Sequence, residues 1–308
     1  MKISSDWPAL SYEAWSETCD TLHTHTQILG KLAVKLAPPE PQLQHTALGL
    51  TSRGWETPTM PAPDGSGAII AALDLRTHEA TIEHSDGREA RIPLTPHRPV
   101  AEITRDVLGE VGRLAGAVEI NPTPQEVPWT VPLDEDFEHA RYESDQVESY
   151  FTAATYAALA LAEFRAPYRG RSTPVNAWWG TFDLAVSFFS GEPVDPPSDD
   201  FIMRNSGDAE QISIGWWPGD QKYPNAAFFA LAYPQRDGFS DAEIDPAAAH
   251  WDPELGEFVL EWEDIRAEPD PGGLALEFAH AVFQHACLIC DWDPELAGSA
   301  KGTPPPVH

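Results

Sequence analysis

The chain has 308 residues, of which 42% are hydrophobic and 22% charged, a composition typical of a folded globular protein. Its 49 acidic residues outnumber 19 basic ones and give a formal net charge of -30 at pH 7. Such a charge repels phosphate backbones and anionic lipids, so we exclude nucleic acids and membrane surfaces as primary partners. The simpler interpretation of the charge is solubility, and the alternative is an acid-dependent binding role.

The cysteine content and the N-terminus favour a cytoplasmic protein. Residues 1–8 lack the apolar run of a signal peptide, and no stretch approaches 18 uninterrupted apolar residues. Three cysteines, Cys19, Cys287 and Cys290, are too few for a disulfide framework. Scarce lysine with abundant alanine and proline suggests a bacterial genome of high GC content. The pattern does not indicate an oligomeric state.

In the first part of the chain, apolar side chains recur at alternating spacings of three and four from Tyr12 to Leu29, which predicts a helix over 11–29. Gly30 is expected to end this helix, and alternation over 31–36 predicts a strand. Strands over 46–57 and 68–75 and a hairpin at Asp86-Gly87 follow. A second helix is expected from Pro99 to Gly116.

The same order of elements recurs after a segment rich in proline and acid, residues 120–144. A helix is expected over 145–165 and a long buried strand over 175–189. Further strands are expected over 211–216, 226–233 and 257–262, and a last helix over 271–290.

These elements predict an α+β protein of two pseudo-repeated α-β-β-β-β-α units, with mainly antiparallel sheet and helices packed on the sheets. The expected divisions are a first repeat over 1–119, a linker over 120–144, a second repeat over 145–296 and a disordered tail over 297–308. Chance recurrence of helices and strands is the alternative to duplication. A cleft between the repeats would be the default ligand site.

Several motifs resemble an uncharacterised, largely actinobacterial family of proteins known only as a domain of unknown function. The motifs are Thr26-Gln27-Ile28-Leu29-Gly30-Lys31, Trp179-Gly180-Thr181-Phe182-Asp183-Leu184-Ala185 and Gly215-Trp216-Trp217-Pro218-Gly219. The resemblance covers nearly the whole chain, and its most specific part is the segment that begins at Trp179.

The resemblance also implies a metal site in relatives, which have His at the position of Asn176 and a His-Glu pair at Ala209-Glu210. Two histidines and a carboxylate would suit a non-haem metal. This chain keeps only Glu210 of that set. We therefore predict no metal ligands here, and the sequence leaves the cofactor unknown.

Two pairs of adjacent tryptophans, Trp178-Trp179 and Trp216-Trp217, stand out. Neighbouring residues of a strand face opposite sides, so one indole of each pair should be buried and the other should face a cleft or solvent. An outward indole suggests a ligand-binding wall. The alternative is a sheet covered on both faces by helices.

Three titratable residues are candidate catalytic groups: Asp183, His23 and Glu210. Asp183 lies within an apolar strand, where a carboxylate is either paired with a cation, such as Arg171 or Lys31, or functional. Of the two histidines on the first helix, we expect His23 rather than His25 to face inward, as a structural residue, a ligand or a base. Glu210 precedes a strand, where burial beside indoles would raise its pKa, and the alternative is a solvated surface acid.

Cys287 and Cys290 form a CxxC pair near His280 and His285, but no second pair completes a zinc site, so core packing is the favoured interpretation. No P-loop, GxSxG or HExxH motif is present. The leading hypothesis is an enzyme acting on a small molecule, with Asn176 and Lys31 joining the four tryptophans as binding residues. The alternative is a non-catalytic ligand-binding or scaffold protein.

Overall fold

The structure is a computed structural model that describes residues 7–299 and divides into two compact units. Of the described residues, the first unit comprises 12–151 and 176–183, and the second comprises 7–11, 152–175 and 184–299. These boundaries do not coincide with the predicted boundaries at 119 and 145, and the internal duplication stays a prediction. Of the predicted tail, residues 300–308 lie outside the described residues.

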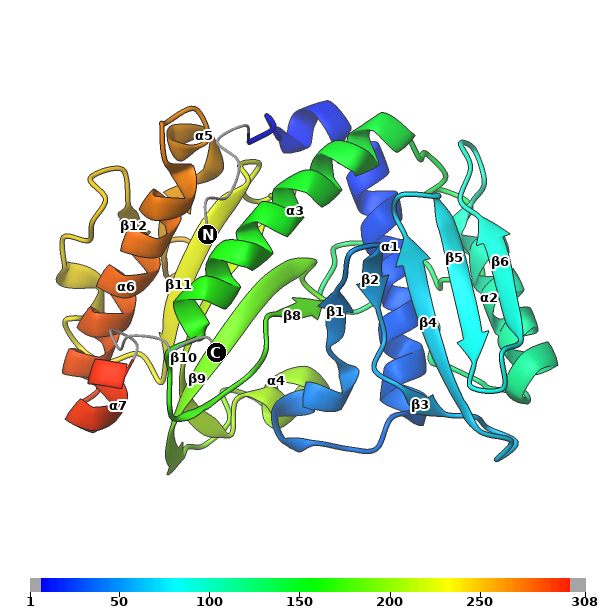
Figure 1. Ribbon diagram of the computed structural model, residues 1–308, viewed down its shortest axis with the longest axis horizontal. Coiled ribbons are helices and arrows are strands. Elements are labelled where there is room, and N and C mark those ends of the chain that lie inside the picture. The colour runs from blue at the N-terminus through cyan, green and yellow to red at the C-terminus, as the bar shows by residue number, and fades with distance from the viewer. Residues whose placement is uncertain (1–6, 300–308) are drawn as a thin grey trace, which may run out of the picture. The chain divides into compact units, whose positions relative to one another are not determined.

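The first unit contains two long helices and a sheet of short antiparallel strands (Figure 1). The strands pair in the order β8-β1-β2-β4-β5-β6, with β3 beside β4, and helix α2 lies against β5 and β6. The elements are α1 (Tyr12–Leu36), η1 (Pro41–Thr46), β1 (Leu48–Leu50), β2 (Gly54–Glu56), β3 (Met60–Pro61), β4 (Ala68–Asp74), β5 (Glu79–His84), β6 (Glu89–Pro93), α2 (Val100–Ala115) and β8 (Asn176–Trp178).

The second unit has longer antiparallel strands in the order β12-β13-β11-β10-β9, with β7 beside β9, and helix α6 packs on β10, β11 and β13 (Figure 1). Helix α3 (Ser144–Arg165) begins in the first unit and ends in the second. The other elements are β7 (Arg171–Ser172), β9 (Asp183–Pro193), α4 (Phe201–Ser206), β10 (Ala209–Trp217), β11 (Ala227–Tyr233), η2 (Phe239–Asp241), β12 (His250–Asp252), β13 (Glu257–Glu261), α5 (Trp262–Ile265), α6 (Pro271–Ile289) and α7 (Pro294–Ser299).

The predicted class, helices combined with antiparallel sheet, is confirmed. The predicted hairpin at Asp86-Gly87 joins β5 to β6, and Gly116, with a φ of 97°, follows the last residue of α2. Within residues 7–299, none of the helices combines the length and hydrophobicity needed to cross a bilayer.

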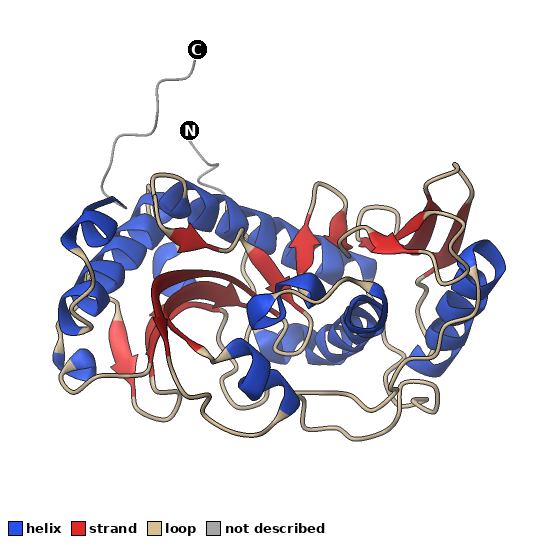
Figure 2. Ribbon diagram, turned by 90° about the horizontal axis from the view of Figure 1, so that it is seen from below, coloured by secondary structure: helices blue, strands red, loops and turns tan. Residues whose placement is uncertain are grey.

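Helix α1 does not end at Gly30, and the predicted strand over 31–36 is wrong. The helix continues to Leu36, and its ten residues from Thr24 to Ala33 are all buried (Figure 2 shows it nearly end-on). It contacts α2, η1, β3 and β4 of the same unit. A helix surrounded on all sides loses the amphipathic period on which the sequence prediction depended.

Gly30 has a packing role in this helix. A Cβ atom placed on it would overlap the indole ring of Trp179. The glycine therefore permits the ring to lie directly against the backbone of α1, and its φ is not in the left-handed region.

The predicted strand over 175–189 is interrupted, because residues 179–182 form a turn between β8 and β9. Phe182 has a φ of 61°, which is costly for a residue with a bulky side chain. Its ring is stacked with those of His23, Trp55 and Tyr150, at centroid distances of 4.9, 5.2 and 5.0 Å. Burial among three rings offsets the backbone strain.

Both histidines of α1 contact the interior, but His25 is the more buried of the two, whereas His23 is half-buried against the ring of Phe182. His25 is 1% exposed, and neither of its ring nitrogens has a hydrogen-bond partner among the described residues. Burial lowers the pKa of His25 to about 3, which keeps the ring neutral.

The close approach of Gly30 and Trp179 gives a stability prediction. We expect Gly30→Ala to lower the free energy of unfolding by about 1–3 kcal/mol, because the added methyl group overpacks the contact with the indole. Chemical denaturation followed by circular dichroism measures the change.

Gly109→Ala is the matched control, since Gly109 lies inside α2 with nothing within 4 Å of an added Cβ atom. We expect this variant to gain about 0.5–1 kcal/mol, because alanine loses less entropy in a helix than glycine does. Equal stability of the two variants would contradict the packing role of Gly30.

Candidate functional site

One face of α1 binds the turn between β8 and β9. His23 and Gln27 are four residues apart, so both side chains project from the same side of the helix. Nε2 of His23 lies 3.1 Å from the Trp179 carbonyl oxygen and 2.9 Å from that of Gly180. Nε2 of Gln27 donates to the Trp179 carbonyl at 3.2 Å. These donors satisfy carbonyl groups that the interrupted strand leaves unpaired.

The loop that follows α2 reaches the same helix face. Nε2 of Gln27 also donates to the carbonyl oxygen of Gln125 at 2.8 Å, and the amide of Gln125 donates back to Oε1 of Gln27 at 3.1 Å. Nζ of Lys31, one turn further along α1, lies 3.4 Å from Oε1 of Gln125 and 5.5 Å from the centre of the Trp179 ring. Lys31 is 4% exposed, and burial lowers its pKa to about 8.

The next residue of this loop, Glu126, has a φ of 59°, which is in the left-handed region. Phe182, on the turn between β8 and β9, has the same backbone conformation. The carboxylate of Glu126 lies against Gly180, where a Cβ atom would overlap Oε2. Strained backbone of this kind concentrates at functional sites.

Asp183 is the buried carboxyl group of the region. It is 7% exposed, it accepts a hydrogen bond from the hydroxyl group of Thr181, and none of the ion pairs within residues 7–299 includes it. Burial raises its pKa to about 7, and the negative charge of Glu126 adds to the rise. The predicted pairing with Arg171 or Lys31 is not observed for Asp183.

We call these residues the Asp183 cluster: His23, Gln27, Lys31, Glu126, Thr181 and Asp183. Thr181 and Glu126 are exposed, so solvent and small solutes reach the rim beside the buried carboxyl group. A carboxyl group with a pKa of about 7 can both donate and accept a proton at neutral pH.

The structure divides the predicted site residues between the two units. The first unit holds His23, Lys31, Asn176, Trp178, Trp179 and Asp183, and the second holds Glu210, Trp216 and Trp217. The shared cleft stays a prediction. Gln27, Glu126 and Thr181 were missed, although the four-residue spacing of His23, Gln27 and Lys31 was available in the sequence.

The tryptophan pairs alternate in burial, since Trp179 and Trp216 are buried while Trp178 and Trp217 are partly exposed. Trp179 donates from Nε1 to the Thr46 carbonyl at 3.1 Å. Trp216 contacts Trp262, and Trp217 contacts Tyr223 and Phe229. Trp179 and Trp216 thus belong to the cores of their units.

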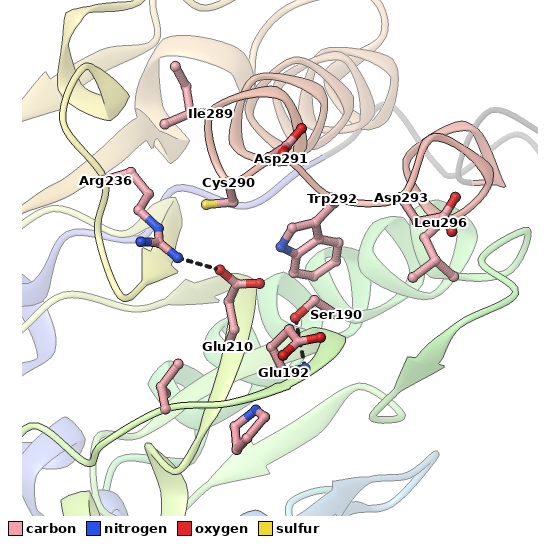
Figure 3. A pocket seen from close by; sticks show the side chains of 12 residues that line it. Ser190, Glu192, Glu210, Arg236, Ile289, Cys290, Asp291, Trp292, Asp293 and Leu296 are labelled. Atoms are coloured by element: carbon pink, nitrogen blue, oxygen red, sulfur yellow. Dashed lines mark hydrogen bonds and ion pairs between the residues drawn. The ribbon is translucent and has the colours of Figure 1, made fainter.

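Glu210 lines a cavity of about 810 Å³ in the second unit (Figure 3). It is 5% exposed, and one of its oxygens lies 3.1 Å from Nη2 of Arg236. The other lining residues are Ser190, Glu192, Pro193, Val194, Ile289, Cys290, Asp291, Trp292, Asp293 and Leu296. Glu210 is therefore a buried, ion-paired residue rather than a solvated acid.

The two cysteines of the CxxC pair are not activated. Burial raises the pKa of Cys287 to about 12 and raises that of Cys290, which borders the cavity. A raised thiol pKa disfavours the reactive thiolate.

The metal site implied for relatives does not fit this chain. Asn176 is buried, and its Nδ2 donates to Oε1 of Gln44 at 2.8 Å. Ala209 has no ligand atom on its side chain, and Glu210 is paired with Arg236. Within residues 7–299, no group of three or more His, Cys, Asp or Glu side chains is placed to hold a metal ion.

The fold and these features define an α+β protein with a buried carboxyl group, Asp183, beside an exposed one, Glu126. The chain belongs to the family of unknown function DUF5996, which it matches over residues 7–299. The resemblance seen in the sequence motifs is thereby confirmed at the level of the family. No curated protein and no solved structure shows significant similarity to the chain.

The raised pKa of Asp183 predicts a pH-dependent stability. The folded protein keeps this carboxyl group protonated up to about pH 7, whereas the unfolded chain releases the proton near pH 3.8. The resulting stabilisation is complete below pH 3.8 and is lost as pH rises through 7. Asp183→Asn cannot ionise, so we expect it to be more stable than the parent at pH 8, by up to about 4 kcal/mol.

Denaturation midpoints measured from pH 5 to pH 8 check this prediction. The advantage of Asp183→Asn should shrink towards pH 5, and Asp134→Asn, at an exposed position, should follow the parent throughout. A constant difference across this range would show that Asp183 ionises normally.

Proposed function

We propose that the protein is an enzyme that moves a proton to or from a small polar molecule, with Asp183 as the acid–base group. The observation that carries the proposal is a buried carboxyl group without a cationic partner, next to a second carboxylate. Burying such a group destabilises the protein when the group is ionised. Asparagine would fill a purely structural role without this cost, so the carboxyl group favours a functional role.

The neighbouring residues have distinct roles in this proposal. The negative charge of Glu126 helps to keep Asp183 protonated, and the Thr181 hydroxyl group fixes the orientation of its carboxyl. His23 and Gln27 position the turn through its backbone carbonyl groups. The substrate class that fits is a small molecule with a weakly acidic proton, which approaches along the exposed rim of Thr181 and Glu126.

Titration of Asp183 followed by infrared spectroscopy, with Asp183→Asn as the reference, tests the premise. We expect an apparent pKa near 7 in the parent and a lower one in Glu126→Gln, because that substitution removes a like charge. Glu119→Gln, at an exposed position after α2, should leave the titration unchanged. A carboxyl group that titrates in the ordinary range would remove the basis of the proposal.

Proton exchange tests the activity itself. The protein is incubated in D2O with a mixture of small carbonyl compounds and hydroxy acids, and NMR spectroscopy detects deuterium at carbon. We expect incorporation into one component, with a rate at least about 100-fold lower in Asp183→Asn. Incorporation that is equally fast in Asp183→Asn would contradict the role of Asp183.

A second candidate function is ligand binding in the Glu210 cavity. Nε1 of Trp292 is buried and has no hydrogen-bond partner among the described residues, and Figure 3 shows the indole nitrogen on the Glu210 side of the ring. Arg236 is half-exposed and supplies further donors, while Glu192 and Asp293 supply acceptors. Donors together with carboxylates favour a zwitterion such as an amino acid.

Trp292→Phe removes the N–H donor and keeps an aromatic ring. If the cavity binds amino acids, this variant should bind them at least about 5-fold more weakly in calorimetric titrations, since one hydrogen bond is lost. Equal affinity in parent and variant, or no binding to the parent, would count against this second candidate.

A further inference from the structure

A serine, a histidine and an aspartate lie in line on two neighbouring turns of the first unit, outside the Asp183 cluster. Oγ of Ser66 lies 3.1 Å from Nε2 of His84, and Nδ1 of His84 lies 2.9 Å from Oδ1 of Asp86. Ser66 belongs to the turn between β3 and β4, His84 ends β5, and Asp86 lies in the turn between β5 and β6. The two contacts place the three residues in the order nucleophile, base and orienting carboxylate.

The backbone holds the two turns together. The amide of Ser85 donates to the Ala68 carbonyl at 2.8 Å, and the amide of Ala68 donates to Oγ of Ser85 at 3.1 Å. Gly67 separates Ser66 from β4, and a Cβ atom on it would lie 2.5 Å from Oγ of Ser85 and 3.1 Å from Cε1 of His84. Glycine at this position therefore permits Ser66 to approach the imidazole ring.

A nucleophilic site needs an exposed nucleophile, a shielded base and a charged carboxylate, and Ser66, His84 and Asp86 have these properties. Ser66 is exposed, while the side chain of His84 is fully buried beneath it. Arg88 donates from Nε to Oδ2 of Asp86 at 2.7 Å and from its amide to Oδ1 at 3.0 Å. These contacts hold the pKa of Asp86 at about 2, so the carboxylate stays charged and fixed in orientation.

The amide of Gly67 directly follows Ser66 and has no hydrogen-bond acceptor among the described residues. An amide at this position, next to a nucleophilic serine, can stabilise the oxyanion of a tetrahedral intermediate.

Two contacts support a purely structural interpretation. The amide of Asp86 lies 3.2 Å from Nδ1 of His84, and it would donate to the ring if that nitrogen carried no proton. His84 would then donate from Nε2 to Ser66 and could not accept the serine proton. Asp64 also competes with His84 for the Ser66 hydroxyl group, because that hydroxyl hydrogen-bonds to the Asp64 carboxylate, which in addition accepts from the Ser66 amide at 2.8 Å. The inference requires the other tautomer, in which the proton on Nδ1 faces Oδ1 of Asp86, 2.9 Å away, and Nε2 accepts from Ser66.

We infer that Ser66, His84 and Asp86 form an acyl-transfer site that hydrolyses small esters. Oγ of Ser66 bonds to the ester carbonyl carbon while its proton passes to Nε2 of His84. The bond from that carbon to the alcohol oxygen then breaks, and His84 returns the proton to the departing alcohol. A water molecule then gives a proton to Nε2 of His84 and bonds to the acyl carbon, the bond from that carbon to Oγ breaks, and His84 returns the proton to Oγ as the carboxylic acid leaves. Because Ser66 lies on an exposed turn, the site fits short acyl groups.

Labelling with a fluorophosphonate, mapped by mass spectrometry, and hydrolysis of p-nitrophenyl acetate test this inference on the full chain. We expect the label on Ser66 and hydrolysis that falls at least about 100-fold in Ser66→Ala. Ser52→Ala is the matched control, because Ser52 is an exposed serine of the same unit without a histidine contact among the described residues, and it should keep the parent rates.

His84→Gln replaces a fully buried ring and can disturb folding, so the role of the histidine is tested through Asp86→Asn, because Asp86 is half-exposed. Asparagine at this position favours the wrong tautomer of His84, so both labelling and hydrolysis should fall at least about 10-fold. Labelling of Ser66 no faster than that of Ser52, or rates unchanged in Asp86→Asn, would overturn the inference and leave the contacts as a structural link between two turns. The result is independent of Asp183.

Discussion

The carbonyl groups of Trp179 and Gly180 must be satisfied where β8 stops, and α1 supplies the donors. His23 and Gln27 reach these oxygens from one face of the helix. The approach is possible because Gly30 presents no side chain to the Trp179 indole. Without these contacts a buried turn would carry unpaired carbonyl groups, which costs about 1–3 kcal/mol for each group. The remaining features of the Asp183 cluster depend on this docking.

The docked turn fixes both Phe182 and Asp183. Phe182 adopts a left-handed backbone, and its ring lies among those of His23, Trp55 and Tyr150. Asp183 directly follows Phe182, so its carboxyl group lies in the interior, although no cation among the described residues is paired with it there. Aromatic packing therefore stabilises a backbone conformation that the carboxyl group alone would oppose.

Two buried carboxyl groups of this protein, Glu210 and Asp183, differ in the groups that contact them. Glu210 is paired with the guanidinium group of Arg236, so its charge is compensated within the cavity wall. Asp183 has a hydroxyl donor and a neighbouring carboxylate, so burial and repulsion act in the same direction on its pKa. Both residues are 5–7% exposed, so they differ in their partners rather than in their degree of burial.

The sequence by itself determined the class of the fold, the hairpin at Asp86-Gly87, the end of α2 at Gly116 and the family, because periodicity, turn residues and motifs are local properties. It also marked Asp183 as a carboxylate out of place in an apolar segment. It could not determine the length of α1, since a helix segment buried on all sides has no polar face. In the sequence alone Gly30 has the properties of a helix-ending residue, and its packing against Trp179 is visible only in the structure. Only the tertiary structure decided that Glu126 and Gln27, far apart in the chain, would meet the turn at Gly180, because such contacts depend on how distant segments pack and leave no local pattern in the sequence.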